Sequence, residues 1–187
     1  MKQNWQPGTM IYPLPAVIVT CGDENRNNLI TVAWTGTICT NPAMCYISVR
    51  PERFSHALLM ENMEFTINLT TENMAKATDW IGCRSGRDYD KWKETGLTPV
   101  QGVKNRCPYI DESPLAIECR VTQVIPLGSH DMMIAQVVNV IADDKYIDPE
   151  TGSFDLQKAK LINYSHGNYY AQGEPLGKFG WSVKKKK

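Results

Sequence analysis

The stretch 28–59 constrains the fold most strongly, because it holds two strand patterns followed at once by a helix start. Leu29–Thr40 and Ala43–Arg50 are rich in residues favoured in strands, and an Asn-Pro turn separates them. The proline after Arg50 fixes the first turn of a helix, which we expect over Glu52–Asn62. This order brings the end of a strand directly to a helix N-terminus.

The rest of the chain adds more strands than helices. Met132–Ile141 carries apolar residues on both faces, as strands do in a closed barrel that a helix or a second subunit covers. We therefore expect a mainly β, antiparallel, Greek-key-like barrel with two or three packed helices. The further expected strands are Ala16–Cys21, Glu64–Leu69, Ser113–Leu127 and Met132–Asp143, and the further expected helices are Glu72–Cys83 and a short one within Tyr89–Thr95.

Length and charge limit the number of domains and the classes of partner. The 187 residues fit one domain, which we assign to residues 1–183, with Lys184–Lys187 as a solvated tail. Without that tail the chain has 16 basic and 20 acidic side chains, so its body is slightly acidic. Nucleic-acid binding is therefore not expected, because it requires a basic face. No apolar run has the length of a membrane span and no signal peptide is visible, so we expect a cytoplasmic protein without membrane contact.

The most distinctive group of polar residues surrounds the start of the expected helix 52–62. It consists of Ser48, Arg50, Arg53, Ser55 and His56. Unpaired N–H groups and the positive end of the dipole stabilise an anion at a helix N-terminus, and guanidinium groups strengthen that preference. This group is either a phosphate site or a solvated basic corner in which Ser55 caps the helix. The residue types alone leave both interpretations open.

The strand before this group has a narrow face that bears hydroxyl groups. Side chains alternate along a strand, so Thr31, Ala33 and Thr35 would share one face, and Val32 and Trp34 the other. From Asn28 onward such a strand could offer backbone N–H and C=O groups to the edge of a planar ring. Threonine is common in ordinary strands, however, and the strand taken alone favours that plainer interpretation.

Other candidate groups are weaker. His130 and His166 lie in expected turns, where a histidine is more often exposed than catalytic. Arg84 and Arg87 lie in a polar loop that either closes over an anionic ligand or is simply solvated. The cysteines and histidines do not have metal-ligand spacing, so no metal site is expected, and no glycine-rich dinucleotide motif occurs.

Several of these residues together resemble the flavin reductase-like family of FMN-binding split barrels, and within it the flavoredoxin-like branch. The resemblance covers nearly the whole chain. It rests on the Asn28-x-x-Thr31-x-Ala33-Trp34 strand, on Ile47-Ser48-Val49-Arg50 running into Arg53-Phe54-Ser55-His56, on the Gly128-Ser129-His130 turn, and on the ending from Tyr169 to Ser182.

The resemblance implies a homodimer of split barrels, each binding one FMN near the subunit interface. Residues implied at the isoalloxazine ring are Thr31, Ala33, Trp34 and Thr35; those implied at the ribityl chain and phosphate are Ser48, Val49, Arg50, Arg53, Ser55 and His56. Asn28, at the start of the same strand, is also expected among the cofactor-binding residues. His130 matches the histidine of the family's Gly-Asp-His turn on the nicotinamide side. Here Ser129 replaces the aspartate of that turn and Gln136 replaces a following glutamate, so the donor side departs from the family pattern.

The leading hypothesis is an FMN-dependent oxidoreductase that passes electrons through its flavin. It is either an NAD(P)H-dependent reductase or a flavoredoxin-like carrier that works with a redox partner protein. The alternative is a barrel that binds a ligand or nucleic acid without catalysis, which would need a basic groove with exposed aromatic residues.

Overall fold

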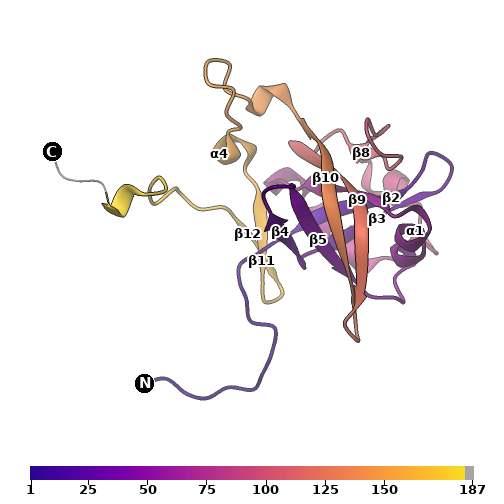
Figure 1. Cartoon of the computed structure of the whole chain (residues 1–187), viewed down its shortest axis with the longest axis horizontal. Coiled ribbons are helices and arrows are strands. Elements are labelled where there is room, and N and C mark those ends of the chain that lie inside the picture. The colour runs from indigo at the N-terminus through magenta and orange to yellow at the C-terminus, as the bar shows by residue number, and fades with distance from the viewer. Residues whose placement is uncertain (184–187) are drawn as a thin grey trace.

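The structure, a computed structural model, describes residues 1–183 (Figure 1). The expected tail Lys184–Lys187 lies outside the described residues. A seven-stranded antiparallel sheet forms the body, and three of its strand pairings join segments that the sequence predicted as strands. Its strands are β2 (Val17–Gly22), β3 (Asn27–Val32), β4 (Thr35–Cys39), β5 (Met44–Val49), β6 (Glu64–Leu69), β9 (Leu115–Pro126) and β10 (Asp131–Ala142).

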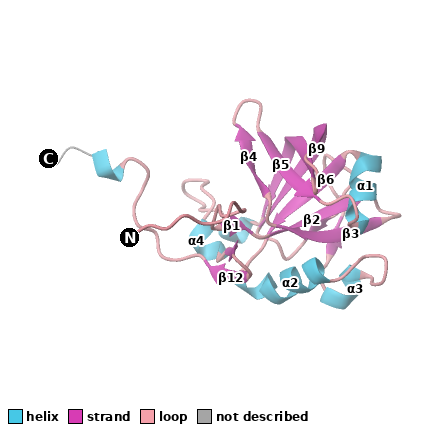
Figure 2. Cartoon of the chain, turned by 90° about the horizontal axis from the view of Figure 1, so that it is seen from below, coloured by secondary structure: helices cyan, strands magenta, loops and turns pink. Residues whose placement is uncertain are grey.

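The order of strands in this sheet forces it to curl. The order is β3-β2-β6-β9-β10-β5-β4, so β3 and β4 form opposite edges although only Ala33 and Trp34 separate them in the chain. The sheet must therefore bend until its two edges meet, and Figure 2 shows the curled strands. We call Ala33–Trp34 the crossing. The expected mainly β, antiparallel barrel is confirmed.

Smaller elements complete the fold. The remaining strands are β1 (Leu14–Pro15), β7 (Pro99–Val100), β8 (Tyr109–Ile110), β11 (Ile162–Ser165) and β12 (Asn168–Ala171). The helices are α1 (Phe54–Asn62), η1 (Glu72–Met74), α2 (Ala75–Cys83), α3 (Lys91–Thr95), η2 (Asp144–Tyr146), α4 (Leu156–Ala159) and η3 (Trp181–Val183). No helix within residues 1–183 is long and apolar enough to cross a membrane.

Two apolar clusters hold the barrel and its helices together. The larger fills the barrel, where Ile47 of β5 and Phe65 of β6 pack with Leu58 and Leu59 of α1. The smaller cluster lies outside the barrel, where Ile81 of α2 packs with residues of β2 and β3. Burial of apolar surface stabilises both, at roughly 25 cal/mol per Å² removed from water. Both faces of β2 and β3 are thus covered, which explains why every residue of β2 and most residues of β3 are buried.

Three predicted boundaries need correction. The single strand Leu29–Thr40 is wrong, because the chain leaves one sheet edge at Val32 and joins the other at Thr35. Side-chain alternation could not reveal this, since the requirement to cross comes from the barrel as a whole. The helix expected from Glu52 begins at Phe54, and the helix expected over Glu72–Cys83 starts with a 3₁₀ turn.

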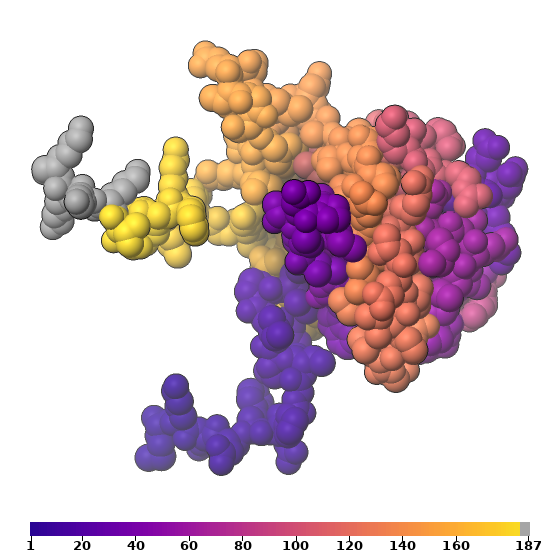
Figure 3. All heavy atoms as spheres, viewed as in Figure 1, coloured from indigo at the N-terminus to yellow at the C-terminus, as the bar shows by residue number. Residues whose placement is uncertain are grey.

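Both ends of the chain extend away from the barrel. Residues 1–12 run outward, and the segment from Leu176 to Val183 also leaves the body (Figures 1 and 3). Its Phe179 and Leu176, like Trp5 at the other end, are almost fully exposed, because no surface of this chain covers them.

Candidate functional site

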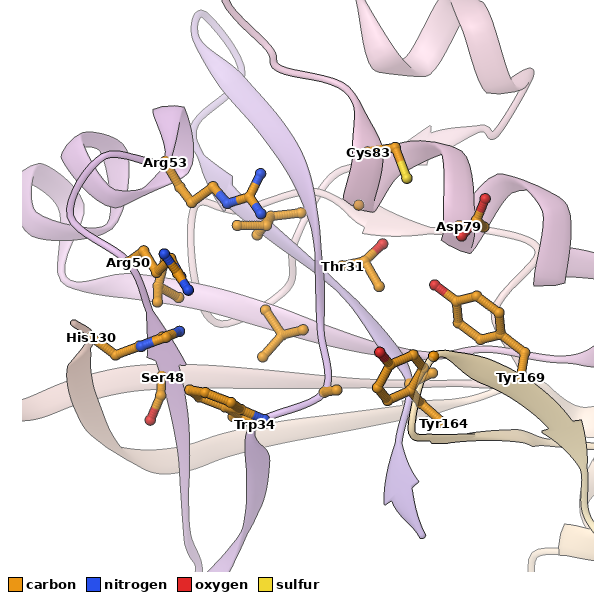
Figure 4. Close-up of a pocket in the computed structure, with 17 residues that line it drawn as sticks. Thr31, Trp34, Ser48, Arg50, Arg53, Asp79, Cys83, His130, Tyr164 and Tyr169 are labelled. Carbon is orange, nitrogen blue, oxygen red and sulfur yellow. The ribbon is translucent and has the colours of Figure 1, made fainter. Parts of the chain in front are cut away.

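Two neighbouring cavities lie where the edges of the barrel meet. The first has a volume of about 410 Å³ and lies between the crossing, α2 and the β11–β12 hairpin (Figure 4). The second, of about 280 Å³, lies between α1 and the loop after α2. Both are lined by Arg50, Arg53, Ile30 and Gly82, so they form one elongated groove. Its size falls in the range of small-molecule sites.

One end of the groove, the arginine end, is cationic. Its charged lining residues are Arg50, Arg53, Glu52, Arg84, Arg87 and Lys91. Arg50 contacts Glu52 at 3.3 Å, and the Arg87 guanidinium donates to the Glu52 carbonyl at 3.2 Å. Five cations against one carboxylate leave a strong preference for an anionic ligand at this end.

The start of α1 forms the floor of the arginine end. Arg53 is the N-cap residue and its side chain makes no capping hydrogen bond. Ser55 does not cap the helix either; its hydroxyl oxygen is buried and accepts a hydrogen bond from the Asn28 amide at 2.7 Å. The His56 N–H already donates to the Arg53 carbonyl at 2.9 Å, so the N–H groups before it, at the very start of the helix, are the ones that an anion could use here.

The loop after α2 lies so close to α1 that only glycine fits at one position. A Cβ on Gly86 would come within 2.3 Å of the Asn28 side-chain oxygen and 2.7 Å of a Phe54 ring carbon. This close approach brings Arg84 and Arg87 into the lining of the groove, as the hypothesis of a loop closing over an anion requires. Arg84 also lies over the Tyr89 ring at 5.6 Å, which orients its guanidinium.

Lys91 is a buried cation that sequence reasoning missed. Only 4% of it is exposed, and its ammonium donates to the carbonyls of Leu29 at 2.9 Å and Ile81 at 2.8 Å. Burial, followed by the positive charge of Arg53, lowers the pKa of Lys91 to about 8. Its position in the first turn of a short polar helix gave no signal of burial.

The opposite end of the groove, the aromatic end, is lined by rings. The rings of Trp34, in the crossing, and His130 lie against each other with centroids 4.3 Å apart and planes tilted by 42°, while Tyr164 and Tyr169 of the β11–β12 hairpin meet edge to face at 5.6 Å. Burial and then the nearby Asp79 raise the pKa of Tyr169 to about 12. Sequence reasoning missed both tyrosines, since nothing along the chain indicates that the C-terminal hairpin folds back here.

His130 lies beside Trp34 at the end of the β9–β10 turn, and it makes contacts within that turn. The Ser129 hydroxyl lies 2.9 Å from the His130 Nδ1 atom, and the Leu127 N–H donates to the His130 carbonyl at 2.9 Å. Partial burial, and then the charge of Arg50, lowers the pKa of His130. This shift favours the neutral form of the imidazole.

Most of the residues that the sequence indicated do meet in the groove. They are Thr31, Ala33, Trp34, Ser48, Val49, Arg50, Arg53 and His130 around the first cavity, and Asn28, Arg50, Arg53 and Ser55 around the second. Two others do not line it. The Thr35 hydroxyl donates to the Tyr46 carbonyl at 2.6 Å, and His56 contacts Asp131 on the other side of α1.

The broken strand explains why Thr31 and Thr35 part. The Thr31 hydroxyl donates to the Thr78 carbonyl of α2, whereas Thr35 faces β5 after the crossing. The idea of one continuous hydroxyl-bearing face is thus wrong. Among residues 1–183 no cluster of three or more metal-ligating side chains is found.

Comparisons with known proteins identify the family. The model of the flavin reductase like domain matches residues 9–171. The structure of flavoredoxin from Desulfovibrio vulgaris (Miyazaki F) is 30% identical and superposes with a TM-score of 0.90, covering 98% of this chain and 100% of that one. Flavoredoxin from Methanosarcina acetivorans has the same coverage, with 23% identity and a TM-score of 0.88, and supports the fold.

A curated relative has a named activity. The NADPH-flavin oxidoreductase of Streptomyces viridifaciens is 24% identical over 132 residues, which is 68% of this chain and 66% of the relative. The family model spans most of the chain, which favours the oxidoreductase over the non-catalytic barrel that the sequence left as the alternative. The chain therefore belongs to the flavin reductase-like family, in its flavoredoxin-like branch, and is a flavin-binding oxidoreductase with a split-barrel fold.

Proposed function

We propose that the protein is an FMN-dependent oxidoreductase, with the phosphate of FMN at the arginine end of the groove and the isoalloxazine ring at the aromatic end. The observation that carries this proposal is the polarity of one continuous groove. Cations gather at one end of it and rings at the other. A flavin mononucleotide has the same order of groups, with a dianionic phosphate and a flat apolar ring joined by a polar chain.

The arginine end fits a phosphate in number and kind of donors. Arg50 and Arg53 supply guanidinium groups, Ser55 supplies a hydroxyl, and the start of α1 supplies N–H groups. Asn28 fixes the Ser55 hydroxyl from behind. His56 is left out of this proposed phosphate site because its imidazole contacts Asp131 instead.

The crossing fits the edge of a flat ring. Val32 is the last residue of β3 paired to β2, and Thr35 is the first residue of β4 paired to β5. Between them, within residues 1–183, only the Trp34 carbonyl has a backbone partner, the Ser48 N–H at 2.9 Å. The other backbone groups of Ala33 and Trp34, two residues that line the groove, are left without a ladder partner, and the small Ala33 side chain would let a ring edge approach them.

Bound FMN would supply the redox chemistry, as flavins do in other oxidoreductases. The residues of this chain then hold and orient the cofactor and exclude water from its ring. In its neutral form the His130 imidazole adds no charge beside Trp34, and no acid or base of the protein has to take part. Backbone donors at the crossing would favour a more electron-rich ring.

Two classes of electron donor fit this proposal, a partner protein and a nicotinamide nucleotide (NADH or NADPH). We favour the protein donor. The 30% identity to a flavoredoxin over nearly the whole chain supports a carrier, as does Ser129 in place of the family aspartate. Anaerobic mixing of the FMN-loaded protein with NADH and with NADPH tests this choice. We expect the visible flavin band to persist; rapid bleaching by either nucleotide would establish the reductase instead.

The proposed cofactor site is tested separately from the donor. We expect Arg53→Ala to raise the Kd for FMN by roughly tenfold to a hundredfold, the value of one charge-assisted hydrogen bond, and to leave the Kd for riboflavin unchanged. Fluorescence titration of both flavins measures this. An unchanged Kd for FMN would contradict the assignment of the phosphate to the arginine end.

We also propose that the protein is a homodimer with the groove near its interface. A further cavity of about 530 Å³ lies on the outer face of β5, lined by Trp34, Ser48, Tyr46 and residues of the N-terminal arm. Trp34 and Ser48 line the groove as well, so the apolar surface and the groove are contiguous. The exposed Ile38 extends this surface along β4. We expect Ile38→Arg to produce monomers with weakened FMN binding, as measured by light scattering and titration.

A further inference from the structure

His56 has a well-defined environment that the proposed cofactor site does not use. Its Nε2 atom lies 2.7 Å from the Asp131 carboxylate, and the two side chains are only 14% and 17% exposed. A partly buried hydrogen bond to a carboxylate is among the stronger side-chain contacts. The pair joins α1 to the first residue of β10, two elements that are distant in sequence.

Asp131 directly follows His130, and the two side chains contact different parts of the molecule. Asp131 starts β10 opposite Val49 of β5 and contacts His56 of α1, whereas His130, the last residue of the turn, lines the groove against Trp34. Because the two residues are adjacent, a contact that holds Asp131 against α1 restrains the backbone next to His130.

The turn that carries His130 projects from the barrel rim. Gly128 adopts a φ of +91°, in the region that glycine tolerates best, and Leu127 is 60% exposed. A two-strand turn of this kind is held mainly by its own hydrogen bonds and by whatever contact anchors its base. The His56–Asp131 pair provides that contact on the side facing α1.

We propose that His56 and Asp131 are positioning residues: their hydrogen bond ties the β9–β10 turn to α1 and so fixes His130 against Trp34. The same helix forms the floor of the arginine end through Ser55, one residue away. Helix α1, which we propose binds the phosphate, would thereby also position His130 beside the site proposed for the flavin ring. This inference rests on the proposed function for its consequence in catalysis, but the positioning itself does not depend on a bound cofactor.

Trp34 fluorescence tests the positioning without any cofactor. Each variant is compared with the same variant carrying Trp34→Phe, so that the difference reports Trp34 alone. We expect His130→Ala, Asp131→Ala and His56→Ala to change this emission alike, and His56→Ala to add nothing to Asp131→Ala. Equal Trp34 emission in the wild type, in His56→Ala and in Asp131→Ala would overturn the proposal.

Conservative and control variants keep the test interpretable. Asp131→Asn retains an oxygen that accepts from the imidazole, so it should restore the wild-type emission. Glu61 lies on the same helix as His56 and makes only an exposed contact with Arg26, so Glu61→Ala should leave the Trp34 emission unchanged. Circular dichroism checks that each variant is folded. Should Asp131→Ala not fold, the comparison of His56→Ala and Asp131→Asn with the wild type still tests the proposal.

Flavin titration separates this proposal from the idea that His56 binds phosphate. We expect His56→Ala and Asp131→Ala to change the Kd for FMN by less than about threefold, since neither side chain lines the groove. A loss of about tenfold or more in His56→Ala, with Asp131→Ala unaffected, would make His56 a phosphate ligand and overturn the proposal. Wild-type protein that binds no flavin would refute the proposed function and leave the fluorescence result intact.

Discussion

The two ends of the groove are built in different ways. The arginine end takes Arg50, Arg53 and Ser55 from one strand-to-helix junction, and its other cations from the loop after α2 and the start of α3. The aromatic end joins the crossing, the β9–β10 turn and the β11–β12 hairpin, which come from three separate parts of the sequence between Ala33 and Ala171. Under the proposed function, the strength of FMN binding should therefore depend mainly on a local motif, and the surroundings of the ring on the assembled fold.

The largest expected effect falls on the arginine end. We expect the double variant Arg50→Ala with Arg53→Ala to weaken FMN binding by at least about a hundredfold, because two charge-assisted contacts are lost. Riboflavin, which lacks the phosphate, should bind as it does to the wild type. Comparable losses for both flavins would mean that the two ends are not distinct in their roles.

A smaller effect is expected at the aromatic end. Trp34→Ala should weaken FMN and riboflavin alike, by roughly tenfold, because an aromatic contact with the ring is lost and the phosphate is unaffected. Titration with both flavins measures the effect. Trp181→Ala, on the exposed C-terminal segment, is the matched control and should leave both Kd values unchanged.

The pH dependence of binding sharpens the comparison further. The pKa of Lys91 is about 8 in the folded chain, and phosphate binding should raise it by adding a negative charge nearby. The Kd for FMN should then rise by up to about tenfold from pH 7 to pH 9, with proton uptake on binding, because binding requires the charged lysine. Calorimetry in two buffers of different ionisation enthalpy detects the uptake. Lys91→Gln should abolish it, and a pH-independent Kd in the wild type would exclude Lys91.

The same lysine predicts how the cofactor-free fold responds to pH. Its folded pKa of about 8 lies below the ordinary value of 10.5, so the unfolded chain binds more protons between these two values. Stability of the cofactor-free protein should therefore rise with pH across that window, and Lys91→Gln should remove this contribution. Denaturant titrations at pH 8 and pH 10 measure the difference.

Salt should produce the smallest effect. Raising ionic strength from about 0.05 to 0.5 M should weaken FMN binding a few-fold, because exposed guanidinium groups are screened. Riboflavin binding should not weaken. A salt effect of equal size on both flavins would indicate that charge acts through the fold rather than through the phosphate.

The contrast between the two ends also explains what the sequence could predict. Arg50, Arg53 and Ser55 were found because a strand that runs into a helix leaves a pattern that can be recognised along the chain. Tyr164, Tyr169 and Lys91 were missed because only tertiary contacts bring them to the groove. Adjacent residues can also diverge: Ser55 faces the groove and His56 faces Asp131, since neighbours on a helix point about 100° apart.

Strand alternation failed at the crossing for a related reason. The run 29–40 reads as one strand, but the strand order places its two halves at opposite edges of the sheet. The mainly β barrel and its packed helices were predictable from the many short β-branched runs. The break at Ala33–Trp34 was not, because it follows from closure of the whole sheet.

The crossing has a consequence for the stability of the fold without cofactor. The edge strands β3 and β4 follow each other in the chain but do not pair with each other, so the sheet stays open where they approach. At the crossing, Ala33–Trp34, the chain passes from one edge to the other outside both ladders. A ring edge bound there would supply the hydrogen-bond partners that the backbone of the crossing lacks, so that binding of the proposed cofactor would also complete the pairing of this part of the sheet.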